Sequence, residues 1–156
     1  MKQLFIKKEN SPRLLLFFAG WGSDENLFRR TVAEGYDCLL CFDYRTLEFD
    51  YSLLDGYREI RLLAWSMGVW VAGQILSGHT YPWEMKLAVN GTPFPIDDRR
   101  GIAEAVFHGT LENFSDATLA RFRRRICGGA GQVKEFLSRQ PYRTTEELGA
   151  ELAALE

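Results

Sequence analysis

Hydrophobic residues in the first half of the chain fall into short continuous runs, separated by stretches with helical character. A short continuous apolar run is typical of a strand that is covered on both faces of a parallel sheet. Because such runs alternate with helices, the pattern predicts an α/β fold in which helices flank a parallel sheet. Strands are expected at residues 4–7 (peripheral), 14–18, 37–42, 59–65 and 86–89, and helices at residues 23–35, 51–54 and 67–76.

The helix expected after residue 22 has recognisable ends. Ser23 can cap it, and Asp24 and Glu25 suit the positive end of the helix dipole. Gly35 is typical of the residue at which a helix stops. The residues expected to face the sheet are Leu27, Phe28 and Val32.

The pattern changes after Asn90. A proline-rich loop over residues 91–98 is followed by helical periodicity only, and the last helix begins with the capping box Thr144-x-x-Glu147. We therefore expect residues 1–90 to form the α/β core. Residues 91–156 form a helical lid segment over the C-terminal edge of the sheet, with helices at 101–111, 115–127, 132–138 and 145–155.

Residues 60–73 contain an apolar strand, a single serine and a helix of small residues. The pattern Ala64-x-Ser66-x-Gly68 is similar to the strand–elbow–helix turn on which hydrolases present a serine nucleophile. In that turn, glycines let the helix pass close to neighbouring strands, and Ala64 stands where the first glycine is usual. The alternative is that Ser66 caps an ordinary helix.

The run at residues 14–18 leads into Gly20-Trp21-Gly22. An acyl-transfer intermediate needs two backbone donors, one from the residue after the nucleophile and one from the loop after an earlier strand. The candidate oxyanion-hole donors are therefore the amides of Met67 and Trp21. A nucleotide-phosphate loop is disfavoured because Glu25 stands where that fingerprint needs glycine or alanine.

Four stretches of the chain, residues 17–22, 41–44, 64–68 and 90–98, resemble the BioG-type pimeloyl-acyl-carrier-protein methyl ester esterases of biotin synthesis. The likeness extends over essentially the whole chain. It implies an α/β-hydrolase in which Ser66 is the nucleophile that removes a methyl group from an acyl chain on acyl carrier protein. Family members continue beyond the point where this chain stops.

Arginines are concentrated on one face of the helix expected at residues 115–127. Arg121, Arg124 and Arg125 share that face, while Leu119, Phe122 and Ile126 form an apolar stripe. With the family resemblance, the three arginines are candidates for docking acidic acyl carrier protein, whose prosthetic arm carries a phosphate. Arg99 and Arg100 could extend the patch. The alternative is a solvated basic face favoured by the helix dipole.

A serine nucleophile needs a base and an orienting acid. His79 is expected at the wrong end of its helix, and His108 lies in the lid segment. Asp97 and Asp98 are candidate acids with a competing capping role. We expect that the last strand or two, with the acid and the histidine, are missing from this chain. The alternatives are a natural end and a compact variant that uses His108. An open sheet edge would favour oligomers.

The composition of the chain limits the classes of partner and cofactor that it could have. The 156 residues are 46% hydrophobic and 26% charged with a net charge of −2, which predicts one globular domain without global attraction to nucleic acid or anionic membranes. No targeting or membrane-spanning segment is apparent, so a cytoplasmic location is expected. Cys38 and Cys41 lie in a predicted buried strand and are interpreted as core residues, and neither a metal nor an organic cofactor is implied.

The sequence leaves two roles possible for one short segment. Asp43-Tyr44-Arg45 ends a strand at the edge where ligands gather in open parallel sheets, so it could line the site. It could equally be a solvated loop in which Asp43 pairs with Arg45. Three functions are considered for the chain: the methyl ester esterase, a general short-acyl esterase or thioesterase, and a non-catalytic module that binds acyl carrier protein.

Overall fold

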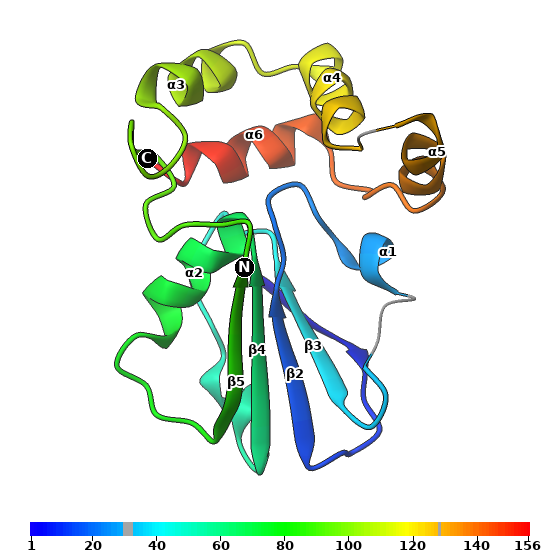
Figure 1. Cartoon of the computed structure of the whole chain (residues 1–156), viewed down its shortest axis with the longest axis vertical. Helices are drawn as coiled ribbons and strands as arrows, with labels where there is room; N and C mark the ends of the chain where they lie inside the picture. Colours follow the sequence, from blue (N-terminus) through cyan, green and yellow to red (C-terminus); the bar gives the residue numbers. More distant parts are fainter. Residues whose placement is uncertain (30–32, 128) are drawn as a thin grey trace.

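The computed structural model describes residues 1–29, 33–127 and 129–156, and its centre is a five-stranded sheet with strand order β1-β3-β2-β4-β5 (Figure 1). Strands β2, β3, β4 and β5 run parallel, as expected, whereas β1 pairs antiparallel with β3. The expectation of a parallel sheet was thus wrong for this edge strand. The strands are β1 (Lys2–Lys7), β2 (Arg13–Phe18), β3 (Asp37–Phe42), β4 (Glu59–Trp65) and β5 (Trp83–Val89).

The two outer strands are longer than the sequence suggested. Lys2 pairs with Phe42, so β1 begins before the first apolar residue of its run. Trp83 pairs with Ile60 and a register shift follows, so β5 begins three residues before Lys86. In both places, pairing with an inner strand extends the ladder beyond the residues that the sequence pattern had assigned to the strand.

Helix α1 (Glu25–Phe28) begins one residue later than expected, because Asp24 caps it through a carboxylate that accepts from the Asn26 amide at 2.9 Å. Phe28 packs edge-on against Phe17 of the sheet, as predicted. The expectation for Val32 lies outside the described residues. Gly35 lies in a turn before β3 with φ +74°, and the described helix stops well before it.

Two other elements of the core have the predicted bounds, the 3-10 turn η1 (Tyr51–Leu54) and helix α2 (Met67–Leu76). One face of α2 packs onto the sheet, so that a core forms between the helix and β2, β3 and β4. The core residues with the least exposure include Leu14, Leu16, Phe18, Leu39, Ile60 and Val71, all at 0%. This core fixes where β4 and α2 meet.

Strand β3 is buried along its entire length, and it carries two of the three cysteines. Cys38 and Cys41 are buried free thiols, which confirms their interpretation as core residues. Burial raises the pKa of the Cys41 thiol well above its usual value. A neutral thiol in this position packs as a small apolar side chain.

Four helices of the lid segment lie over the end of the sheet at which the parallel strands finish (Figure 1). The first helix of the lid segment begins at residue 104 rather than 101. Residues 95–102 instead close a turn in which the Ile102 amide donates to the Pro95 carbonyl at 2.9 Å. The predicted capping box of Thr144 and Glu147 is present. The helices are α3 (Glu104–Glu112), α4 (Asp116–Ile126), α5 (Ala130–Ser138) and α6 (Thr145–Ala153).

Strand β5 forms an open edge of the sheet. Met85, Leu87 and Val89 alternate along it, and between 39% and 46% of each side chain is exposed. Across the three described ranges, no helix combines the length and the apolar character needed to cross a membrane.

Candidate active site

Ser66 occupies a strained turn between the inner strand β4 and helix α2. Its backbone angles are φ 55° and ψ −123°. L-residues avoid this region because of steric crowding around Cβ, at a cost on the order of 1–3 kcal/mol. A serine held there by its surroundings has the geometry of a nucleophile elbow, the turn at which a strand delivers a hydroxyl to the edge of a sheet.

Close backbone packing holds Ser66 in this conformation. Its amide donates to the Val89 carbonyl of β5 at 2.9 Å. A methyl group on Gly68 would lie 2.3 Å from the Phe18 carbonyl oxygen, and one on Gly91 would lie 2.3 Å from the Ser66 carbonyl oxygen. Only glycine fits such contacts with backbone atoms. The chain after β5 and the start of α2 therefore depend on glycine to bring Ser66 into place.

The hydroxyl of Ser66 does not cap α2. The N-cap position carries no side-chain hydrogen bond to the helix. Among the described residues, none is a hydrogen-bond partner of the Ser66 hydroxyl either. The alternative in which Ser66 is an ordinary capping serine is therefore wrong for this structure, and the hydroxyl is available for other chemistry.

The glycine-rich loop after β2 lies directly beside Ser66. Phe18 pairs with Ala64 on adjacent parallel strands, so the two chain segments leave the sheet together. A methyl group on Gly20 would lie 3.2 Å from Ser66 Cβ. In the described part of the chain, no backbone or side-chain acceptor bonds to the amide of Trp21 or of Met67. The structure thus brings together the three residues that the sequence had singled out.

Neither histidine of the chain contacts Ser66. His79 follows α2 and stacks between Tyr51 and Tyr81, whose ring centroids are 4.5 and 6.1 Å from its own. It lies at the end of α2 opposite to Ser66, as predicted. His108 lies on α3 with half of its side chain exposed, and its Nδ1 is 3.1 Å from a carboxylate oxygen of Glu156. His108 therefore has a surface role here.

Asp97 and Asp98 stabilise the turn before α3. Asp97 accepts from the amides of Arg99 and Arg100 at 3.0 and 2.8 Å and from the Arg100 guanidinium at 2.8 Å. The Arg100 side chain and these amides lower the pKa of Asp97 to about 2. Asp98 accepts from the Glu104 amide at 3.0 Å. These contacts support the competing capping role.

The basic face predicted on α4 is present. Arg121, Arg124 and Arg125 are exposed, and they form no ion pair with any residue in the described ranges. Leu119 is buried, as its position in the stripe predicts, whereas Ile126 is 50% exposed because it lies at the end of the helix. Arg100 is not part of this face, since it stacks on the Phe94 ring and pairs with Asp97.

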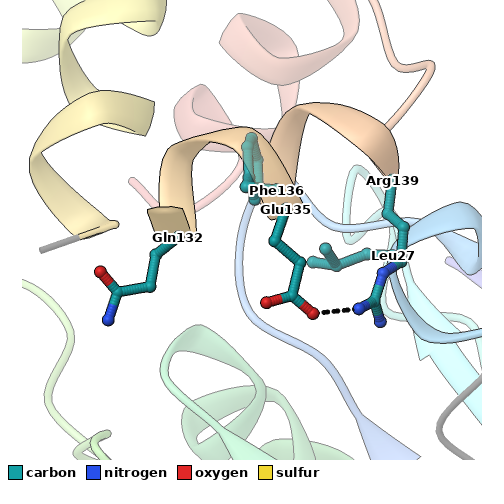
Figure 2. A pocket seen from close by; sticks show the side chains of 5 residues that line it. All are labelled: Leu27, Gln132, Glu135, Phe136 and Arg139. Carbon is teal, nitrogen blue, oxygen red and sulfur yellow. Dashed lines mark hydrogen bonds and ion pairs between the residues drawn. The ribbon is translucent and has the colours of Figure 1, made fainter. Parts of the chain in front are cut away.

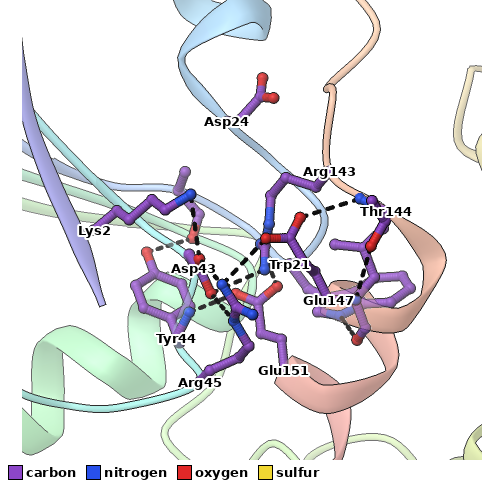
Figure 3. Close-up of polar contacts among 12 residues, drawn as sticks. Lys2, Trp21, Asp24, Asp43, Tyr44, Arg45, Arg143, Thr144, Glu147 and Glu151 are labelled. Carbon is purple, nitrogen blue, oxygen red and sulfur yellow. Dashed lines mark hydrogen bonds and ion pairs between the residues drawn. The ribbon is translucent and has the colours of Figure 1, made fainter.

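A buried ionic cluster joins the loop after β3 to the lid segment, and sequence reasoning missed it (Figure 3). Arg143 donates to Glu151 at 2.5 Å and to Asp43 at 3.0 Å, and all three side chains are at most 4% exposed. Arg45 pairs with Asp43 at 2.7 Å, as one alternative proposed. That carboxylate is buried, however, so the expectation of a solvated loop was wrong.

The pKa values of the two carboxyl groups in the cluster are shifted in opposite directions. Burial raises the pKa of Glu151, although Arg143 and the Tyr44 amide, at 2.7 Å, oppose the shift. Burial would also raise the pKa of Asp43, but the hydrogen bonds from Arg45 and the charge of Arg143 lower it overall. A sequence signal existed, because Glu151 lies in line with Leu148 and Leu152 on the buried face of α6.

Two cavities lie away from Ser66. One, of about 210 Å³, lies between Leu27 of α1 and the last turns of α5, where Glu135 pairs with Arg139 just after the helix (Figure 2). The other, of about 400 Å³, lies between α4 and the residues at the start of α6. Ser66, Trp21 and Met67 line neither cavity, so neither is assigned to the candidate active site.

The fold and the strained serine define the class of protein. A mostly parallel sheet that delivers a serine on a sharp turn into a helix is an α/β-hydrolase-like arrangement. The family model of the pimeloyl-ACP methyl esterase BioG matches residues 1–156, and the chain belongs to the BioG family.

Two solved structures share the fold. A crystal structure of BioG from Haemophilus influenzae superposes with a TM-score of 0.88 at 42% identity, covering 99% of this chain and 71% of that one. A lipase-esterase related protein from Clostridium acetobutylicum has a TM-score of 0.67 at 15% identity, covering 98% and 70%. The second likeness shows the fold alone. Together they confirm the predicted α/β-hydrolase-like fold.

Two curated relatives are similar in sequence over most of the chain. A malonyl-[acyl-carrier protein] O-methyltransferase from Bacteroides fragilis is 51% identical over 141 residues, which are 90% of this chain. An uncharacterized protein from Haemophilus influenzae is 44% identical over 143 residues, or 91% of this chain. The chain spans 29% of the first relative and 65% of the second.

Proposed function

We propose that this chain carries the serine nucleophile and the oxyanion hole of an esterase that hydrolyses the methyl ester of pimeloyl-acyl carrier protein in biotin synthesis. The observation that carries the proposal is the strained conformation of Ser66, whose hydroxyl is not used as a helix cap. Backbone strain of this kind persists where the surroundings enforce it, as at active sites. The BioG family match supplies the substrate class.

In the proposed reaction, the Ser66 oxygen attacks the carbonyl carbon of the methyl ester. The resulting oxyanion accepts hydrogen bonds from the Trp21 and Met67 amides, and the positive end of the α2 dipole favours the same negative charge. Methanol leaves with a proton. Water then attacks the acyl-serine ester, which releases the free carboxylate on the carrier and restores the Ser66 hydroxyl.

The proton on Ser66 must pass to a base, and this proposal gives that role to neither histidine of the chain. His79 stacks between tyrosines and His108 faces Glu156. This observation favours a second candidate function, a module that binds acyl carrier protein without hydrolysis. The two candidates share the carrier as partner and differ only in turnover.

The basic face of α4 is the proposed docking site for the carrier. Arg121, Arg124 and Arg125 are exposed and can meet acidic groups and the phosphate of the prosthetic arm. The name of the Bacteroides fragilis relative also refers to an acyl carrier protein, although it describes methyl transfer. The match covers 29% of that relative, and the strained serine favours ester hydrolysis for the part represented here.

The test compares the chain with its Ser66→Ala variant on pimeloyl-acyl carrier protein methyl ester, with product detected by mass spectrometry. Any turnover by the chain should be abolished in the variant, because the nucleophile is lost. Undiminished turnover in the variant would exclude Ser66 as the nucleophile. Carrier binding that weakens with salt, without any turnover by the chain itself, would support the binding module instead.

The second arm separates the carrier-bound ester from general esterase action. Reversing the charge at Arg121, Arg124 and Arg125 should raise KM for the carrier-bound ester and leave hydrolysis of a small free ester unchanged. Reversing Arg100, which already pairs with Asp97, is the matched control and should leave carrier docking unchanged. Equal effects on both esters would contradict docking through α4.

A further inference from the structure

The side chain of Trp21 is held by the lid segment rather than by the sheet alone. Its indole N–H donates to the Leu148 carbonyl of α6 at 3.1 Å. Its ring packs edge-on against Phe114 and Phe122, with centroids 5.6 and 5.3 Å away. In the part of the chain that the structure describes, every hydrogen bond and ring-to-ring contact of Trp21 is with the lid segment.

The backbone on the N-terminal side of Trp21 is held by the sheet. The Ala19 amide donates to the Cys41 carbonyl at 3.0 Å, and the Tyr44 hydroxyl donates to the Ala19 carbonyl at 2.8 Å. Gly20 lies against Ser66. On the C-terminal side, Asp24 accepts from the Tyr142 amide of the lid segment at 2.6 Å. The Trp21 peptide group therefore lies where sheet support ends and lid support begins.

Helix α6 can act as a fixed support because it is itself tied to the sheet. Glu151 accepts from the Tyr44 amide at 2.7 Å, and it follows Leu148 by three residues, so both lie on the same face of the helix. Tyr44 is the residue that also bonds Ala19. A short chain of contacts therefore links α6 to both sides of the loop: the Leu148 carbonyl holds the Trp21 indole, and Glu151 holds Tyr44, which bonds the Ala19 carbonyl.

We propose that the lid segment positions the backbone amide of Trp21 for oxyanion binding, with Phe122 and the Leu148 carbonyl as positioning groups. This inference rests on the proposed function, in which that amide is one of two oxyanion donors. Displacement of α4 or α6 releases the indole and moves the amide. The lid segment thereby controls the assembly of the oxyanion hole.

The test uses the whole chain labelled with ¹⁵N-tryptophan, which gives one backbone amide signal for each of the four tryptophans. Phe122→Ala removes one ring from the indole and Phe122→Tyr restores it. Phe136→Ala is the matched control, because Phe136 lies on another lid helix and lines the cavity beside Leu27. The Trp65 amide, next to Ser66, is the internal reference for an intact core.

In Phe122→Ala, the order parameter of the Trp21 amide should fall from about 0.85 to below about 0.6, while that of Trp65 stays high. Phosphonylation of Ser66 by a fluorophosphonate should slow by about 10- to 100-fold, because a displaced donor stabilises the developing charge poorly. Phe122→Tyr should restore both quantities, and Phe136→Ala should change neither.

A rigid Trp21 amide in folded Phe122→Ala would overturn the inference. So would a mobile amide with an unchanged rate of phosphonylation, because the lid would then not serve the reaction. If the unaltered chain is not phosphonylated at Ser66, the serine has no activating base in this chain and the binding module is favoured. The order parameters then still decide whether the lid holds the amide. Phe114→Leu repeats the test with a smaller change should Phe122→Ala fail to fold.

Discussion

Removing the charge of Arg143 is expected to destabilise the fold by about 3 kcal/mol. The Arg143→Met change keeps much of the volume but leaves two buried carboxyl groups without their shared cation. Breaking a buried ion cluster in this way typically costs about 3–5 kcal/mol. The lower end applies here because Asp43 retains Arg45 at 2.7 Å and Glu151 retains the Tyr44 amide at 2.7 Å.

The free energy of unfolding is measured by urea denaturation, with equal slopes required of every variant. Arg45→Met is the matched control. Its side chain is 38% exposed, so its loss should cost no more than about 1 kcal/mol. Adding Glu151→Met to Arg143→Met removes the orphaned carboxyl and should recover part of the loss, since the Tyr44 amide then loses its acceptor. A cost below about 1 kcal/mol for Arg143→Met would refute the reasoning.

The same variant carries a pH signature. Burial raises the pKa of Glu151 in the folded state, and Arg143 opposes that shift, so the pKa rises further without Arg143. A carboxyl whose folded pKa is raised destabilises the fold increasingly as pH rises through that pKa. The loss caused by Arg143→Met should therefore shrink as pH falls toward the ordinary glutamate pKa of 4.5. A constant or growing loss would contradict the assignment.

Two further predictions concern packing and charge elsewhere. Gly68→Ala should destabilise the fold by about 1–3 kcal/mol, because its methyl group would lie 2.3 Å from the Phe18 carbonyl oxygen. Gly73→Ala, on the exposed face of the same helix, should stabilise the fold by about 0.5–1 kcal/mol. Urea denaturation of both variants checks that the two changes have opposite signs. Burial opposes ionisation of Asp37, but amides of Glu9 and Ser11, the Tyr57 hydroxyl and Lys8 lower its pKa to about 2. Its stabilisation should be complete above its ordinary pKa of 3.8 and disappear as pH falls toward 2, so the deficit of Asp37→Asn should vanish in acid.

The sequence was sufficient to locate the candidate site because its signals are local. An apolar run, a serine and small residues at fixed spacing predict the junction of β4 and α2, and the bounds of α2 are confirmed. The glycines at positions 20 and 68 were likewise visible as positions where a side chain would not fit. Whether Ser66, Trp21 and Met67 act in catalysis stays a prediction.

What the sequence could not predict are contacts between residues far apart in the chain. Asp43 and Arg143 are separated by 100 residues, and each alone resembles an ordinary surface charge. Pairing also decided the direction of β1, since an edge strand with weak periodicity takes its register from its neighbour. The ring contacts of Trp21 with α4 depend in the same way on how the lid segment folds back over the sheet.

The cost of the elbow indicates why the proposed active site is built at this junction. Strain at Ser66, on the order of 1–3 kcal/mol, would relax if any neighbouring segment could move away. The glycines at the start of α2 and after β5 prevent this, because each allows a contact with a backbone oxygen that a methyl group would forbid, and Gly20 lets the loop after β2 lie close to Ser66. A junction without the strained turn could carry larger side chains at these positions, which would reduce the entropy of the unfolded state. Strained geometry at Ser66, maintained at some cost in stability, therefore supports the proposal that Ser66 serves a reaction.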